Sequence, residues 1–217
     1  MAAEGVVDTE EVNGPMILDL HYTWQDGDHT HHDMLQRVWF DQLPDARYPA
    51  ARTLEVRMPA EPRAHVPHRQ AALEWRTIRG GHPSSYGLLG ATFTPDPSDT
   101  LTIQVALATE DDRWLDWTLI TVPLDEVQRG IPYLWEGEAV LGSAGETAAP
   151  ALGSGTLLFD CAAYGHVGSS PWVFYRLARG VVHFLSADSS SVTEERAKDY
   201  LRDLFSREPV STNGQHR

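Results

Sequence analysis

Alternating apolar and polar positions predict a series of β-strands along the first three quarters of the chain. From Met16 to Trp24 every second residue is apolar, which is the pattern of a strand that buries one face. The same alternation, or a short apolar run, predicts further strands at 54–58, 73–77, 86–94, 101–107, 117–122 and 155–164. Pro and Asp dominate residues 95–99, so this stretch is expected to be the loop of a hairpin.

Apolar residues spaced by three and four predict an amphipathic helix that packs on this sheet. Ser170 is expected to cap its N-terminus, and Pro171 to occupy its first position, where proline needs no amide hydrogen. The apolar stripe runs from Phe174 to Leu185. The opposite, polar face is expected to contain Arg176, Arg179, His183 and Ser186.

Weaker signals predict the remaining segments. Pro132 interrupts an apolar stripe, so the helix there is expected to kink or restart. Ser191 and Glu194 form a capping box for the last helix. The helices expected from these signals lie at 34–43, 124–135 and 192–206. The expected irregular segments are a polar loop at 25–33, a turn at 80–85 and a flexible linker of small residues at 142–155.

The composition is that of a globular protein with one or two compact domains. The chain has 217 residues, of which 41% are apolar and 22% charged, so it can bury a sizeable core. Its single cysteine, Cys161, excludes an internal disulfide and a cysteine-based metal site. No apolar run reaches the roughly 18 residues of a membrane span, and the acidic residues 1–13 do not resemble a signal peptide. A cytoplasmic location without membrane contact is therefore expected.

Charge is distributed unevenly along the chain. The net charge of −14 argues against general binding to DNA, other nucleic acids or anionic membranes. Residues 1–46 contain ten acids and one arginine, whereas residues 47–90 have a net charge of +4. This basic block is the only segment that would attract an anionic partner, and an ordinary solvated face is the alternative interpretation.

Three stretches resemble domain IV of elongation factor G and of the tetracycline-resistance ribosomal protection proteins. They are RGGHPSSYG at 79–87, VPLDEVQRG at 122–130 and FDCAAYGHVGSSPWVF at 159–174. The resemblance, over residues 73–185, implies an α+β two-layer sandwich of the ribosomal protein S5 domain 2 type. Such a fold has a mostly antiparallel sheet, helices on one face and a left-handed βαβ crossover. The chain then divides into a disordered tail (1–15), an N-terminal β extension or small lobe (16–60), a domain IV-like domain (61–187) and a C-terminal helix with its tail (188–217).

In the parent factors, two loop tips of this domain reach the ribosomal decoding centre. By motif they correspond to Arg79–Tyr86 and Tyr164–Ser169 in this chain. The resemblance implies that arginines there contact phosphate and that tyrosines stack on unpaired bases. The RNA- or anion-binding residues expected on this basis are Arg76, Arg79, His82, Tyr86, Tyr164 and His166. The chain departs from the family at Gly165, where many relatives have histidine, and at Gly168, where an acid is common.

The GTPase domain of those factors has no counterpart in the sequence. No G-x-x-x-x-G-K-[ST] phosphate loop occurs, and the single lysine, Lys198, follows no such turn. The sequence therefore favours a non-enzymatic, cofactor-free binding protein whose partner is the ribosome, structured RNA or another protein. Trp114 and Trp135 are candidates for a protein-contact surface, and the oligomeric state stays open.

Histidines and aspartates crowd into the stretch DGDHTHHD at 26–33. Imidazole and carboxylate groups bind Zn²⁺ and other transition ions, so an enzyme of unknown reaction that uses a metal here is the rival hypothesis. A solvated polar loop is the alternative, because no spacing such as H-E-x-x-H supplies an established metal motif. The candidate metal ligands are Asp28, His29, His31 and His32.

Overall fold

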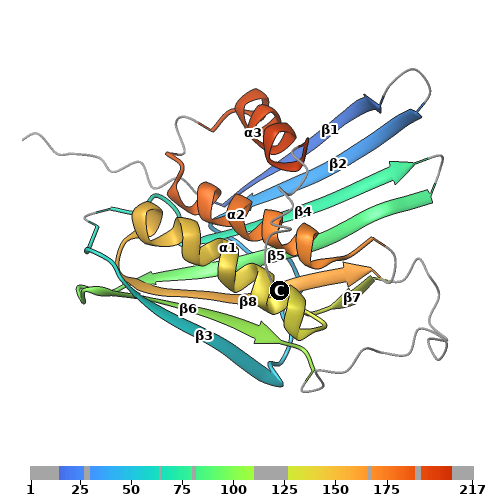
Figure 1. Cartoon of the computed structure of the whole chain (residues 1–217). Coiled ribbons are helices and arrows are strands. Elements are labelled where there is room, and N and C mark those ends of the chain that lie inside the picture. The colour runs from blue at the N-terminus through green and yellow to red at the C-terminus, as the bar shows by residue number, and fades with distance from the viewer. Residues whose placement is uncertain are drawn as a thin grey trace, which may run out of the picture.

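A mixed β-sheet forms one layer of the structure, and helices cover one of its faces (Figure 1). The structure is a computed structural model that describes residues 15–26, 30–63, 65–79, 82–109, 127–165, 168–188 and 192–206. The strands are β1 (Met16–Asp26), β2 (Thr30–Phe40), β3 (Arg52–Pro59), β4 (Gln70–Arg79), β5 (His82–Pro95), β6 (Thr100–Leu107), β7 (Val127–Arg129) and β8 (Gly155–Gly165). The helices are α1 (Leu134–Leu152), α2 (Pro171–Ser186) and α3 (Glu194–Ser206).

The strands follow the order β1-β2-β4-β5-β8-β6-β3 across the sheet, and β7 pairs with the end of β8. Neighbouring strands are antiparallel except β6 and β8, which are parallel. Strands from the first 60 residues lie at both edges, with β1 and β2 beside β4 and with β3 beside β6. Residues 16–60 thus share their sheet with the rest of the chain.

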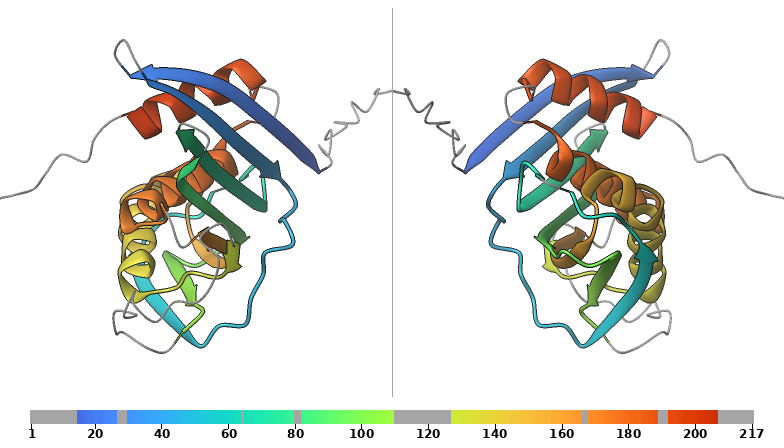
Figure 2. Two further views of the ribbon diagram at one scale, coloured as in Figure 1. Left: turned by 90° about the vertical axis from the view of Figure 1, so that its right-hand side faces the viewer. Right: turned by 90° about the vertical axis from the view of Figure 1, so that its left-hand side faces the viewer.

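One face of the sheet packs against the helices. Side chains alternate between the two faces along each strand, so every second residue lies on this face. Val38 and Phe40 of β2 lie on this face and are fully buried. Helix α2 covers β4 and β5, α1 covers β6 and β3, and α3 lies at the β1 side (Figure 2). A Cβ at Gly87 would lie 2.8 Å from both Val173 Cγ1 and Leu177 Cδ1. Glycine at this position therefore lets α2 pack directly on β5.

The opposite face is partly covered by the segment 41–51, which connects β2 to β3 (Figure 2). The carbonyl of Ala46 accepts a 3.0 Å hydrogen bond from the amide of Ala162 in β8. Leu43 packs down at Gly90, where a Cβ would lie only 2.9 Å from Leu43 Cδ2. The buried side chains on this face are Trp39, Ala46, Ala72, Tyr86, Leu88, Cys161 and Ala163.

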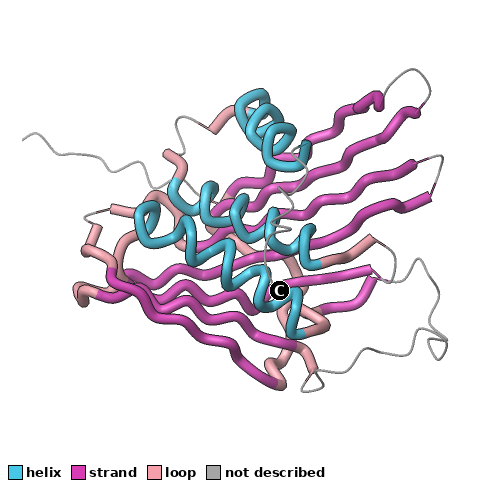
Figure 3. The backbone as a smooth tube through the Cα atoms, viewed as in Figure 1, coloured by secondary structure: helices cyan, strands magenta, loops and turns pink. Residues whose placement is uncertain are grey.

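Two expectations for the β1–β2 region are wrong. The predicted polar loop at 25–33 is mostly strand, since β1 extends to Asp26 and β2 begins at Thr30. The predicted helix at 34–43 is the second half of β2 (Figure 3). Its apolar run arises because Phe40 packs under the helices while Trp39 packs against the other face. Burial on both faces of a strand produces a run that resembles a buried helix.

Two expectations around Pro132 are wrong as well. Strand β7 replaces the helix predicted before this proline, and α1 begins at Leu134. The linker predicted at 142–155 is the second half of α1 and the start of β8. Small buried residues let this helix lie close to its neighbours, and the Ser143 hydroxyl donates a 2.7 Å hydrogen bond to the Tyr175 carbonyl of α2. Tertiary packing here outweighs the low helix propensity of glycine.

Helix α2 begins as predicted. Ser170 is its N-cap, and the side-chain oxygen accepts a 3.4 Å hydrogen bond from the amide of Val173. The predicted polar face is wrong at one position, because Arg176 is only 7% exposed. Its guanidinium carbon lies 4.8 Å from the centre of the Trp172 ring, so the ring shields it from solvent.

Helix α3 begins one residue after Thr193, whose hydroxyl oxygen accepts a 3.3 Å hydrogen bond from the amide of Arg196. The predicted cap, Ser191, lies outside the described residues, as do the predicted strand at 117–122 and nearly all of the predicted tail at 1–15. The α+β class with a mostly antiparallel sheet and helices on one face is confirmed.

Candidate nucleic-acid interface

The β4–β5 hairpin and the bend between β8 and α2 lie at the same end of the sheet (Figure 1). The Ser169 hydroxyl donates a 2.6 Å hydrogen bond to the carbonyl of Tyr86 and accepts a 3.0 Å bond from the amide of Gly165. The amide of Tyr86 in turn donates to the carbonyl of Gly168 over 3.4 Å. These bonds fasten the bend to β5, so the described parts of the two expected loop tips are neighbours.

Four of the expected binding residues belong to this hairpin. Arg76 pairs in register with Tyr86, and Arg79 pairs with His82 at the end of the two strands. Arg76 is exposed to solvent. His166, the last of the expected residues, lies outside the described residues.

The two expected tyrosines differ from what base stacking requires. Tyr86 is only 8% exposed and packs with Trp39 and Leu88 on the open face of the sheet. Burial raises the pKa of Tyr86, and the neighbouring charge of Glu74 raises it further. The Tyr86 ring therefore packs in the cluster on the open face of the sheet, and its expected contact with a base stays a prediction. Tyr164 is half-buried, and its hydroxyl donates a 2.5 Å hydrogen bond to Gln128 Oε1 on β7.

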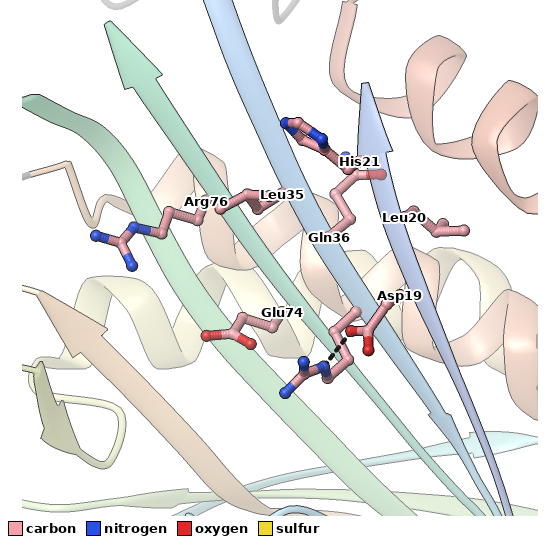
Figure 4. A pocket seen from close by; sticks show the side chains of 8 residues that line it. Asp19, Leu20, His21, Leu35, Gln36, Glu74 and Arg76 are labelled. Carbon is pink, nitrogen blue, oxygen red and sulfur yellow. Dashed lines mark hydrogen bonds and ion pairs between the residues drawn. The ribbon is translucent and has the colours of Figure 1, made fainter. Parts of the chain in front are cut away.

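The sheet face away from the helices presents a row of charged side chains next to these residues. Asp19, Arg37 and Glu74 occupy matching register positions on β1, β2 and β4. Arg37 and Asp19 form an ion pair, which Figure 4 marks with a dashed line. This hydrogen bond is the main reason why the pKa of Arg37 is raised, and the charge of Glu74 adds to it. The Arg37 charge is thus balanced within the row.

A second row lies one step nearer the hairpin tip. It contains His21, Leu35, Arg76 and Tyr86, again at matching register positions. A shallow cavity of about 310 Å³ lies over the two rows (Figure 4). Its apolar border includes Leu35, which is 38% exposed. Arg76 is the cation of these two rows that has no acid opposite it in the register.

Sequence reasoning found Arg76 but missed Asp19, Arg37 and Glu74. Their polar positions between apolar ones mark a solvent-facing side of each strand. These three residues lie in one row because β2 pairs with β4, although β3 lies between these strands in the chain. The spacing of residues along the sequence does not reveal which strands pair.

Of the candidate metal ligands, Asp28 and His29 lie outside the described residues. His31 and His32 occupy consecutive positions of β2, paired with Gln25 and Trp24 of β1. Within the described ranges, no group of three or more His, Cys, Asp or Glu side chains could hold a metal ion. The metal hypothesis therefore has no geometric support in the part of the chain that the structure covers.

Trp135, at the start of α1, is 56% exposed, whereas Trp114 lies outside the described residues.

In the described part of the chain, no helix is long and apolar enough to cross a bilayer. Comparison with family models, with curated proteins and with solved structures gave no match to this chain.

Proposed function

We propose that this chain is a non-enzymatic binding protein of the translation-factor domain IV type, and that it contacts structured RNA on the ribosome with one end of its sheet. The contact consists of the β4–β5 hairpin and the bend between β8 and α2. The observation that carries the proposal is the hydrogen bond from the Ser169 hydroxyl to the carbonyl of Tyr86. It joins the two segments that the resemblance assigns to loop tips.

The order of elements supports the ribosomal protein S5 domain 2 type. From β4 to α2 the chain runs as three strands, a helix, a strand and a helix, apart from the short β7. Strand β8 lies between β5 and β6 and is parallel to β6. In Figure 1, α1 lies in front of the sheet and connects to β8, which is the neighbour of β6. The side of β6 on which β8 lies is the one expected of a left-handed β6–α1–β8 crossover. Right-handed crossovers are the general rule, so this handedness is a specific point of likeness.

The proposed electrostatic contact involves one end of the sheet rather than the whole chain. The net charge of −14 opposes association with a polyanion. At physiological salt, however, charges more than about 8 Å apart are largely screened. Exposed Arg76 can therefore contact phosphate although the rest of the chain is acidic. The resemblance assigns the same role to Arg79, which follows three residues later in β4. Affinity for the ribosome should then be modest and should fall as salt is raised.

Cosedimentation with purified bacterial ribosomes tests the proposal. We expect binding at low salt and a decrease on the order of tenfold between 50 and 200 mM salt. Arg76→Glu should weaken binding and reduce the salt dependence by about one unit of slope, as for the loss of one phosphate contact. Arg57→Glu is the matched control, because Arg57 is exposed on β3 at the far edge of the sheet.

Three results would contradict the proposal. Absence of binding even at low salt removes the ribosome as partner. Equal loss of binding in the Arg57 and Arg76 variants would show that overall charge, not this end of the sheet, governs association. Binding that is insensitive to salt and requires Leu35 would instead indicate a protein partner on the open face.

A further inference from the structure

Buried polar atoms without partners gather between the sheet and helices α2 and α3. Gln36 of β2 is 3% exposed, and neither atom of its side-chain amide has a hydrogen-bond partner among the described residues. The same holds for the indole nitrogens of Trp75 on β4 and Trp172 on α2. Buried polar groups in folded proteins are nearly always hydrogen-bonded. Four such atoms in one place point to a ligand that bonds to them.

These three side chains belong to one continuous cluster. Gln36 and Trp75 are register partners on neighbouring strands, on the face that the helices cover. The rings of Trp75 and Trp172 have centres 5.5 Å apart. The guanidinium of Arg176 lies over the Trp172 ring at 4.8 Å. The cluster therefore combines two indole donors, one amide with a donor and an acceptor, and aromatic faces.

Phe205, in the last turn of α3, closes this cluster. Its ring centre lies 3.6 Å from that of Trp75 and 6.2 Å from that of Trp172. The planes of the Phe205 and Trp75 rings are inclined at 44°, so the two rings are tilted rather than stacked. Phe205 thus fills the space beside Trp75 that a planar ligand ring would need. Helix α3 lies apart from α1 and contacts α2 and β1 (Figure 2). Displacement of this one helix would expose the cluster without disturbing the sheet.

We propose that Gln36, Trp75 and Trp172 form a site for a planar nitrogen heterocycle of the nucleobase class, and that Phe205 is its removable plug. A glutamine amide offers a donor and an acceptor side by side, which matches the edge of adenine. Ring nitrogens of the heterocycle accept hydrogen bonds from the indole N–H groups, and its face stacks on the tryptophan ring. The site lies on the helix-covered face, so it is independent of the RNA contact proposed above.

Calorimetric titration of the full chain with adenine tests this proposal. The plug competes with the ligand, so the Phe205→Ala variant should bind adenine at least about tenfold more tightly than the unsubstituted protein. Circular dichroism verifies that the variant is folded. The milder Phe205→Leu variant serves if alanine prevents folding. If adenine binding is undetectable or unchanged in the folded variant, the proposal is wrong.

A second substitution tests the polar part of the site. Gln36→Leu preserves most of the side-chain volume but removes the amide. In the Phe205→Ala background it should weaken adenine binding about fivefold or more, and it should leave binding of naphthalene, which has no hydrogen-bonding groups, unchanged. Equal effects on both probes, or no effect on adenine, would show only an apolar cavity and would overturn the assignment.

Discussion

The side-chain hydroxyl of Ser169 donates a hydrogen bond of 2.6 Å to the backbone carbonyl of Tyr86. The same oxygen accepts from the amide of Gly165, so one side chain joins the end of β8, the following bend and the start of β5. Removal of the hydroxyl leaves the Tyr86 carbonyl without this donor and the Gly165 amide without this acceptor.

Ser169→Ala should therefore lower the free energy of unfolding by about 1–3 kcal/mol and weaken ribosome binding as well. Urea denaturation and cosedimentation measure the two effects. Ser186→Ala is the control, since the Ser186 hydroxyl donates a hydrogen bond to the His183 carbonyl in the last turn of its own helix. The account is contradicted if both variants unfold at the same urea concentration as the unsubstituted protein.

Alanine substitutions at Gly87 and Gly142 should change the stability of the protein in opposite directions. At Gly87 a Cβ would meet Val173 and Leu177 of α2 at 2.8 Å, so Gly87→Ala should cost about 1–3 kcal/mol of stability by overpacking. At Gly142, in α1, an added Cβ would have no described heavy atom within 4 Å apart from its chain neighbours and its own helix backbone, so Gly142→Ala should stabilise the helix by up to about 1 kcal/mol. Thermal melts of both variants measure the two changes. A stabilising alanine at position 87 would contradict the close approach of α2 to β5.

The strands that alternate cleanly were predictable from the sequence. In β1 and β6 one face is buried and the other is partly solvated, so the two-residue period reflects the structure. The cap of α2 was predictable for a similar reason, because Ser170 and Pro171 satisfy the local chemistry of a helix start. Such elements depend on neighbours in the sequence.

The elements that were predicted wrongly or missed depend on contacts with residues that are distant in the chain. The apolar residues Val38, Trp39 and Phe40 follow one another because the helices bury one face of β2 and the segment 41–51 covers part of the other. The small residues of 142–152 are helical because they lie between the sheet and α2, and their sequence alone resembles a linker. The charged row of Asp19, Arg37 and Glu74 likewise exists only through pairing of three separate strands.

Loss of the contact between Asp41 and His68 should lower the free energy of unfolding. Asp41 has a φ of 53°, and its carboxylate contacts His68 Nδ1 at 2.7 Å and accepts a 2.9 Å bond from the amide of Arg69. His68 is 1% exposed. Asp41→Ala removes both bonds and strains the backbone, so we expect a loss of about 3 kcal/mol. Asp41→Gly removes the bonds without the backbone strain and should cost less. Equal losses in urea denaturation would show that φ is not a factor.

The buried thiol of Cys161 should make the free energy of unfolding depend on pH in the alkaline range. Burial raises the pKa of its thiol to about 12, and the charge of Asp160 adds to the shift. The unfolded thiol has a pKa near 8.5, so folding favours the protonated form. The stability contributed by this group is complete below about pH 8.5 and is lost as the pH rises towards the folded value. Cys161→Ala should remove this part of the pH dependence. An aromatic disulfide reagent at pH 8 should label the thiol only after denaturation, and fast labelling of the folded protein would contradict its burial.

Hydrogen–deuterium exchange of the chain, alone and with ribosomes at low salt, tests the central claim most directly, because it locates the contact. The account predicts slower exchange in peptides covering 76–88 and 164–170, and unchanged exchange in β3 and the exposed side of α1. Protection at β3 or α1 with none at the hairpin would contradict the proposed interface, and so would identical exchange with and without ribosomes.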